Sequence, residues 1–116
     1  MSAILQQFLT VHLPFPGLVG WSVFLEGRSV SHQSHAGWLS SDRIEQVVTG
    51  LIEFVESRGI LESKPGRLVW TFENLLFHLA CRADGAWLVL LVDNRGQPPS
   101  SALLSAVDEF LRMSVE

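Results

Sequence analysis

The chain is 116 residues long, the size of one domain, and its single cysteine excludes an internal disulfide. The net charge is −4 and the eight basic residues are scattered, so no surface for a phosphate backbone is expected and nucleic acid is not an expected partner. No signal peptide and no uninterrupted apolar span are visible, so the sequence predicts a cytoplasmic protein without membrane insertion, folded as one domain over residues 1–116.

The first part of the chain predicts a helix followed by a β-hairpin. Apolar residues recur at helical spacing in SAILQQFLTVH, and the prolines of LPFPG end that helix. Alternation over residues 18–25 predicts a strand with one apolar face, made of Val19, Trp21, Val23 and Leu25. The EGR turn leads to a second strand, about Ser29–Ala36, which is polar on both faces and therefore typical of a sheet edge.

The segment LSSDRIEQVVTGLIEFVESRGI predicts the second helix. Residues 40–42 are all good N-cap types, Asp42 and Glu45 have capping-box spacing, and Gly59 suits the C-terminal stop. Trp38 precedes this helix and is the tryptophan most expected to be exposed, either as a hydrophobic staple or as a partner contact.

The apolar face of this helix is wider than one sheet needs. Its core stripe consists of Ile44, Val47, Val48, Leu51, Ile52 and Val55. Phe54 lies outside the stripe, on a second row with Val47 and Leu51. The second row predicts a surface that meets something other than the sheet.

Three apolar segments, RLVWTFEN, LLFHLACR and AWLVLLVD, predict a meander of antiparallel strands. In the first, Leu68, Trp70 and Phe72 are expected on a core face, whereas Val69, Thr71 and Glu73 form an opposite face that is unusually apolar for one that meets water. The third segment is almost continuously apolar, which indicates a central strand covered on both faces.

A final helix, capped by Ser100 or Ser101, is expected to bury Leu103, Leu104, Val107, Phe110 and Leu111. The element order α-β-β-α-β-β-β-α predicts an α+β fold, a three-layer α/β/α sandwich around a five-stranded antiparallel sheet.

Candidate catalytic and metal-binding residues have simpler structural explanations. His32 and His35 are separated by an odd number of positions on a strand, so they point to opposite faces, and the same holds for His78 and Cys81. Cys81 shares a face with apolar residues and is expected to be a core thiol. We therefore expect no catalytic, cofactor or metal site, and a protein that is not an enzyme.

The stretch PFPGLVGWSVFLEGRSV resembles the opening of the roadblock family, the dynein light-chain roadblock or longin-like regulatory domains. In that family a helix leads to a proline-glycine pair, a glycine-containing strand and an acidic-glycine turn. The matching residues are Gly17, Leu18, Gly20, Val23, Leu25 and Gly27. The segment DGAWLVLLVD resembles the family's closing hairpin, and the resemblance covers about residues 3–112. It departs in VSHQSHA, where members often carry more aliphatic residues.

The resemblance implies a roadblock/profilin-like fold and a homodimer formed through the third strand and the second helix. In that arrangement the third strand pairs with a copy of itself, and the two second helices lie side by side. The residues that would form this interface are Val47, Leu51, Phe54, Leu68, Val69, Trp70, Thr71, Phe72 and Glu73. An edge strand beside a wide apolar helix face favours the same interpretation on physical grounds.

The resemblance also implies a function: a non-enzymatic module that binds a Ras-like small GTPase, as scaffold or as regulator of its nucleotide cycle. Trp38, Arg43 and Glu45, near the start of the second helix, are the candidate contacts. A small, acidic, dimeric secretion-type chaperone is the alternative, although such chaperones typically place three strands between the first two helices, where this chain has room for two. A small-molecule sensor would need an internal cavity, against which the many bulky aromatic residues argue.

Overall fold

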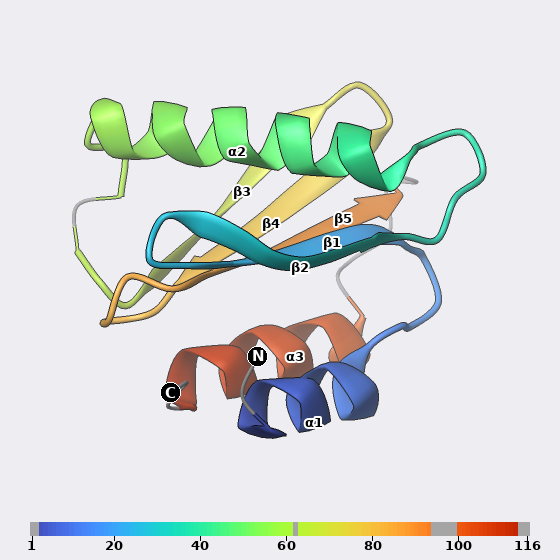
Figure 1. The fold of residues 1–116 in the computed structure, drawn as a ribbon, viewed down its shortest axis with the longest axis horizontal. Helices are drawn as coiled ribbons and strands as arrows, with labels where there is room; N and C mark the ends of the chain where they lie inside the picture. Colours follow the sequence, from blue (N-terminus) through green and yellow to red (C-terminus); the bar gives the residue numbers. More distant parts are fainter. Residues whose placement is uncertain (1–2, 62, 94–99, 114–116) are drawn as a thin grey trace.

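The computed structural model describes residues 3–61, 63–93 and 100–113, which form three helices and one five-stranded sheet (Figure 1). The elements are α1 (Ala3–His12), β1 (Leu18–Leu25), β2 (Arg28–Ser34), α2 (Ser41–Ser57), β3 (Gly66–Phe72), β4 (Leu75–Cys81), β5 (Trp87–Asp93) and α3 (Ser101–Arg112). The predicted element order and the α+β class are confirmed.

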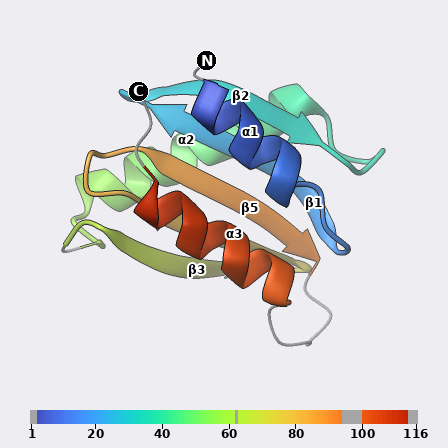
Figure 2. The ribbon, with the colours of Figure 1, turned by 90° about the horizontal axis from the view of Figure 1, so that it is seen from below.

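The strands lie in the order β2-β1-β5-β4-β3, and every neighbouring pair is antiparallel. Helix α2 covers one face of the sheet, whereas α1 and α3 lie side by side on the other (Figures 1 and 2). Strand β5 is the central strand, as predicted. It is covered on both faces, which explains why its residues are almost continuously apolar. Strands β2 and β3 form the two edges.

The core has two halves, one on each face of the sheet. Trp21 and Val23 pack against α1 and α3, whereas Val19 packs under α2. The prediction that Val19 shares the face of Trp21 is therefore wrong. The pairing of β1 with β5 shifts register between Leu18 and Gly20, and such an irregularity reverses the alternation of side chains.

The N-terminus of α2 differs from the predicted capping box. Ser40 is the N-cap, and its hydroxyl accepts a hydrogen bond from the Arg43 backbone N–H at 3.1 Å. Asp42 therefore lies inside the first turn, where its carboxylate interacts favourably with the positive end of the helix dipole. The predicted stop is correct: Gly59 has a φ of +60°, and the next N–H, of Ile60, donates back into the last turn.

Helix α3 begins after the N-cap Ser100, one of the two predicted caps. Its buried residues are Leu103, Ala106, Val107 and Phe110. The prediction that Leu104 is buried is wrong, since its side chain is 43% exposed. The small residue Ala106 occupies the inward position that a pattern based on large apolar residues misses.

Helix α2 approaches β1 closely at Gly20. A Cβ atom added there would lie 2.5 Å from Ile44 Cδ1 and 3.0 Å from the Gln33 carbonyl oxygen. Because Ile44 is fully buried and Gln33 contributes backbone, neither can yield cheaply. We expect Gly20→Ala to lower the free energy of unfolding by about 1–3 kcal/mol in urea denaturation. Gly37→Ala, at a site with open space, is the control and should change it by less than about 0.5 kcal/mol; equal losses would contradict this account.

Candidate functional site

Strand β3 has a free edge. It pairs with β4 over its whole length, from Gly66 opposite Cys81 to Phe72 opposite Leu75, and it is the last strand of the sheet. An edge strand presents a row of backbone N–H and C=O groups that water or another chain must satisfy. The described part of the chain places no further strand beside it.

The face of β3 toward α2 is only partly covered. Leu68 and Trp70 are half-buried there, and Phe72 is 59% exposed. The prediction that all three belong to the core is wrong for Phe72 and only partly right for the others. The backbone of helix α2 lies closest to β1 and β2, so it covers the β3 edge only in part.

The opposite face of β3 is uncovered as well. Val69 is 54% exposed and Thr71 is exposed. Helix α3 packs over β4, and its described contact with β3 is an ion pair of 3.3 Å between Arg67 Nη1 and Asp108 Oδ1, both half exposed. In the described part of the chain, no helix fully covers Val69 on this second face.

The second row of α2 continues this apolar surface. Val47 and Leu51 are half-buried and Phe54 is 39% exposed. The Phe54 ring meets the Trp70 ring edge to face, with centroids 5.6 Å apart, and the Arg58 guanidinium lies 5.2 Å above the Phe54 ring. Phe54 thus joins the helix to the edge strand. We call the surface formed by Val47, Leu51, Phe54, Leu68, Trp70 and Phe72 the α2–β3 surface.

Gly50 lies in the middle of this row. It is separated from Val47 by three positions and from Phe54 by four, so it occupies the same side of α2 as these two residues. It is exposed, and a Cβ atom at this position would meet nothing within 4 Å in the same chain. A glycine inside a helix costs about 1 kcal/mol relative to alanine, and a close approach of another backbone is a reason to keep one.

The candidate partner residues lie together at the N-terminal end of α2. Trp38 is 69% exposed, as predicted, and Arg43 and Glu45 are exposed. Trp38 lines a surface cavity of about 570 Å³, which we call the Trp38 cavity. Its other lining residues are Val19, Phe72, Glu73, Asn74, Leu75 and Asp93. Arg43 and Glu45 are not among them.

The Trp38 cavity combines exposed aromatic rings with carboxylates. Trp38 and Phe72 are among the most exposed large apolar residues of the described chain, and Glu73 and Asp93 supply acidic groups. Glu73 also has a left-handed φ of +51° in the turn between β3 and β4, a conformation that is uncommon outside glycine and asparagine. The sequence did not predict this site, because its parts come from segments far apart in the chain.

An ion pair that no sequence pattern predicted joins the buried Arg82 to the half-exposed Asp84. Arg82 is 2% exposed, and its guanidinium donates to both carboxylate oxygens of Asp84, with Nε 3.1 Å from Oδ1. The same guanidinium lies 5.2 Å above the Phe110 ring, and Asp84 Oδ1 also accepts from the Ala86 N–H. The hydrogen bond from Arg82 lowers the pKa of Asp84. This pair holds the β4–β5 turn against α3.

The residues considered for metal binding stay apart. Cys81 is fully buried under α2, as predicted, and burial raises the pKa of its thiol. His78 is half-buried, and burial lowers its pKa. His32 Nδ1 lies 3.2 Å from the Ser29 hydroxyl. Among the described residues, no group of three or more histidine, cysteine or acidic side chains gathers as a metal site would require.

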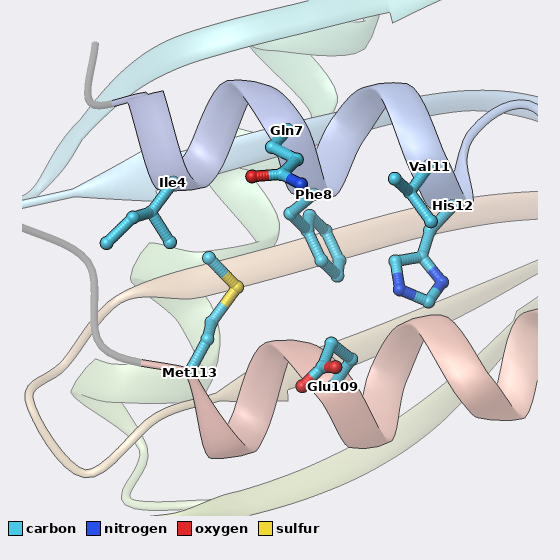
Figure 3. Close-up of a pocket in the computed structure, with 7 residues that line it drawn as sticks. All are labelled: Ile4, Gln7, Phe8, Val11, His12, Glu109 and Met113. Carbon is cyan, nitrogen blue, oxygen red and sulfur yellow. The ribbon is translucent and has the colours of Figure 1, made fainter.

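A separate cavity of about 380 Å³ lies between α1 and α3 (Figure 3). Ile4 and Met113 lie toward one end and His12 toward the other, with Phe8 between the helices. No sequence pattern pointed to this cavity. None of the helices within the described ranges is both long enough and apolar enough to span a bilayer.

Comparison with known proteins identifies the fold. No family model matches the chain, and no curated protein matches its sequence. Among solved structures, MglB of Myxococcus xanthus matches with a TM-score of 0.57 and 13% sequence identity, over 91% of this chain and 80% of MglB. The gliding protein MglB of Thermus thermophilus matches with a TM-score of 0.49 and 18% identity, over 91% and 87%. The chain therefore has the roadblock-like fold of M. xanthus MglB.

Proposed function

We propose that this protein is a non-enzymatic roadblock module that forms a homodimer through the α2–β3 surface and binds a Ras-like small GTPase. The observation that carries the proposal is the unpaired edge of β3, bordered by the exposed apolar row of α2. A two-fold contact needs one self-complementary patch, and an edge strand next to an apolar helix face provides backbone pairing and apolar burial together.

The fold limits the choice of function. Two strands, β1 and β2, lie between α1 and α2, whereas the secretion-type chaperones considered above typically have three. The roadblock resemblance in sequence and the roadblock-like fold agree with each other, and we take both as support for proposing a GTPase partner rather than an unfolded client. Co-purification with an unfolded segment would favour the chaperone instead.

The GTPase is proposed to contact the Trp38 end of α2, where Trp38, Arg43 and Glu45 are exposed. We assign none of the arginines in the described ranges as a finger for phosphoryl transfer. Any effect on hydrolysis would come from ordering the GTPase's own residues around the nucleotide and its attacking water.

Gly50→Ala tests whether the second row of α2 faces water or a second copy. An exposed helix position facing water would gain up to about 1 kcal/mol of unfolding free energy from this change. We expect the opposite in the dimer: the added methyl group should separate the two α2 helices and raise the dimer dissociation constant about tenfold or more, measured by sedimentation. A gain in stability with an unchanged dissociation constant would contradict the proposed interface.

Trp38→Ala tests the GTPase contact. Because the side chain is 69% exposed, its removal should leave the unfolding midpoint unchanged, yet binding to a Ras-like GTPase should weaken by about tenfold or more, as at an aromatic hot spot. The measurement is calorimetry with the small GTPases of the same cell, each loaded with GDP or a GTP analogue. Val11→Ala, on the opposite layer and 67% exposed, is the matched control. Failure of every GTPase to bind the unmodified protein would overturn the proposed partner.

A further inference from the structure

The alternation of backbone groups along β3 limits how a second copy can pair with it. A two-residue turn, Glu73-Asn74, joins Phe72 to Leu75, and the residues that flank such a turn are hydrogen-bonded to each other. The backbone groups of Phe72, and of every second residue before it, therefore point toward β4. Those of Arg67, Val69 and Thr71 point toward the free edge.

A two-fold antiparallel pairing must bring these outward groups opposite one another. The registers that do so while pairing most of the strand are centred on Leu68, Val69 or Trp70. A centre at Leu68 puts Arg67 opposite Val69, and a centre at Val69 puts Arg67 opposite Thr71. Neither of these two registers gives the guanidinium an acidic counterpart.

The centre at Trp70 gives complementary side chains at two places along the strand. Arg67 of each copy comes beside Glu73 of the other, so the basic start of β3 meets the acidic turn residue that follows the strand. Leu68 comes opposite Phe72, which pairs two apolar side chains on the α2 face. Opposite charges and apolar pairs across neighbouring strands are the contacts that stabilise a sheet.

Nothing in the described part of the chain holds these side chains back from that pairing. Phe72 and Glu73 are exposed. Arg67 is engaged at 3.3 Å by Asp108, with both side chains 53% exposed, and a surface pair of that kind contributes little.

We infer that β3 pairs with a second copy in the register centred on Trp70, and that this register completes the Trp38 cavity. The inference rests on the proposed homodimer. Phe72 and Glu73 line the cavity, so Leu68 and Arg67 of the second copy arrive at its rim. Each cavity then has an apolar and a basic group from the other copy, and a protein bound at Trp38 touches both copies.

Disulfide trapping tests the register. Single cysteines are placed at positions 68, 69 and 70, each in a chain whose own cysteine is removed by Cys81→Ser. Each cysteine can form a disulfide with the same cysteine of the second copy only when its position lies at the two-fold axis, because elsewhere the two are too far apart. We expect Trp70→Cys to give the dominant covalent dimer under mild oxidation. Dominant cross-linking by Leu68→Cys or Val69→Cys, with the dimer intact in sedimentation, would overturn the register and leave the proposed function standing. A monomer in every variant and in the unmodified chain would overturn both.

Exchanging the charges of Arg67 and Glu73 tests the same register without replacing Trp70. Arg67→Glu and Glu73→Arg should each raise the dimer dissociation constant by roughly tenfold, since each change puts like charges together twice in the dimer. The double variant should return to within roughly twofold of the unmodified protein. Losses that simply add in the double variant would contradict the pairing of Arg67 with Glu73.

The completion of the Trp38 cavity by the second copy can be followed by NMR. The indole N–H resonance of Trp38, identified by its loss in Trp38→Phe, should shift when the protein is diluted from dimer to monomer. The resonance of Trp87, which is buried within one chain, should stay in place as the internal control. An unchanged Trp38 resonance across a dissociation that sedimentation records would overturn the shared cavity.

Discussion

Replacing Phe54 with aspartate is expected to convert the dimer into monomers, raising the dissociation constant by at least about a hundredfold. The ring lies on Trp70 and under Arg58, at the centre of the α2–β3 surface, and it is 39% exposed in the single chain. A carboxylate at this position can reach Arg58 of its own chain in the monomer, whereas in the dimer it would have to lose its water against the second copy's apolar row. The two-fold axis doubles the penalty, because each dimer contains the change twice.

Val11→Asp is the matched control for this experiment. Val11 is also an exposed apolar residue on a helix, at 67%, but it lies on α1 beneath the opposite face of the sheet. The control should sediment like the unmodified protein. Circular dichroism of both variants separates dissociation from unfolding. A folded Phe54→Asp variant that remains dimeric would exclude the α2–β3 surface as the interface.

Replacing Asp84, whose side chain is 52% exposed, with alanine is expected to lower the free energy of unfolding by about 1–3 kcal/mol, because it leaves the buried Arg82 without its acceptor. The change leaves the guanidinium of Arg82, which is 3% exposed, without its carboxylate, and an uncompensated buried charge is expensive. It also removes the acceptor for the Ala86 N–H in the β4–β5 turn. The measurement is urea denaturation at constant protein concentration. Asp108→Ala breaks an ion pair whose side chains are both half exposed, so it should cost less than about 0.5 kcal/mol. Similar losses in the two variants would contradict the structural role of Arg82.

The same pair predicts how stability depends on pH. Hydrogen bonding from Arg82 lowers the pKa of Asp84 in the folded protein below the ordinary value of 3.8. The stabilisation is therefore fully present above that ordinary value and is lost as the pH falls through the lower, folded pKa. Asp84→Asn should lack this part of the acid dependence when unfolding is followed from about pH 5 down to about pH 2. An identical decline in both proteins would show that the acid sensitivity has another source.

The element order could be predicted because local signals agree along most of the chain. Proline and glycine mark the end of α1 and the hairpin turns, and the apolar run of β5 identifies the centre of the sheet. What failed depended on details that periodicity does not contain. The irregular pairing beside Gly20 moved Val19 to the other face, and α2 begins at Ser40, one of the three predicted caps, without the predicted capping box of Asp42 and Glu45.

The candidate site was predictable only in its parts. The exposure of Trp38 and the extra row containing Phe54 follow from sequence, since neither fits the core stripe of a helix packed on one sheet. That Phe72 is exposed depends on how far α2 extends across the sheet, which is a tertiary property. The meeting of Trp38 with Glu73 in one cavity, and the burial of Arg82, likewise depend on strands brought together by the fold.

The mass of the unmodified protein in solution is the most direct test of the account. Sedimentation equilibrium over a range of concentrations should give a species of twice the 12.9-kDa chain mass, dissociating on dilution. A single-chain mass that persists to high concentration, with the outward amides of β3 protected from exchange within that one chain, would contradict the central claim that this edge is completed by a second copy.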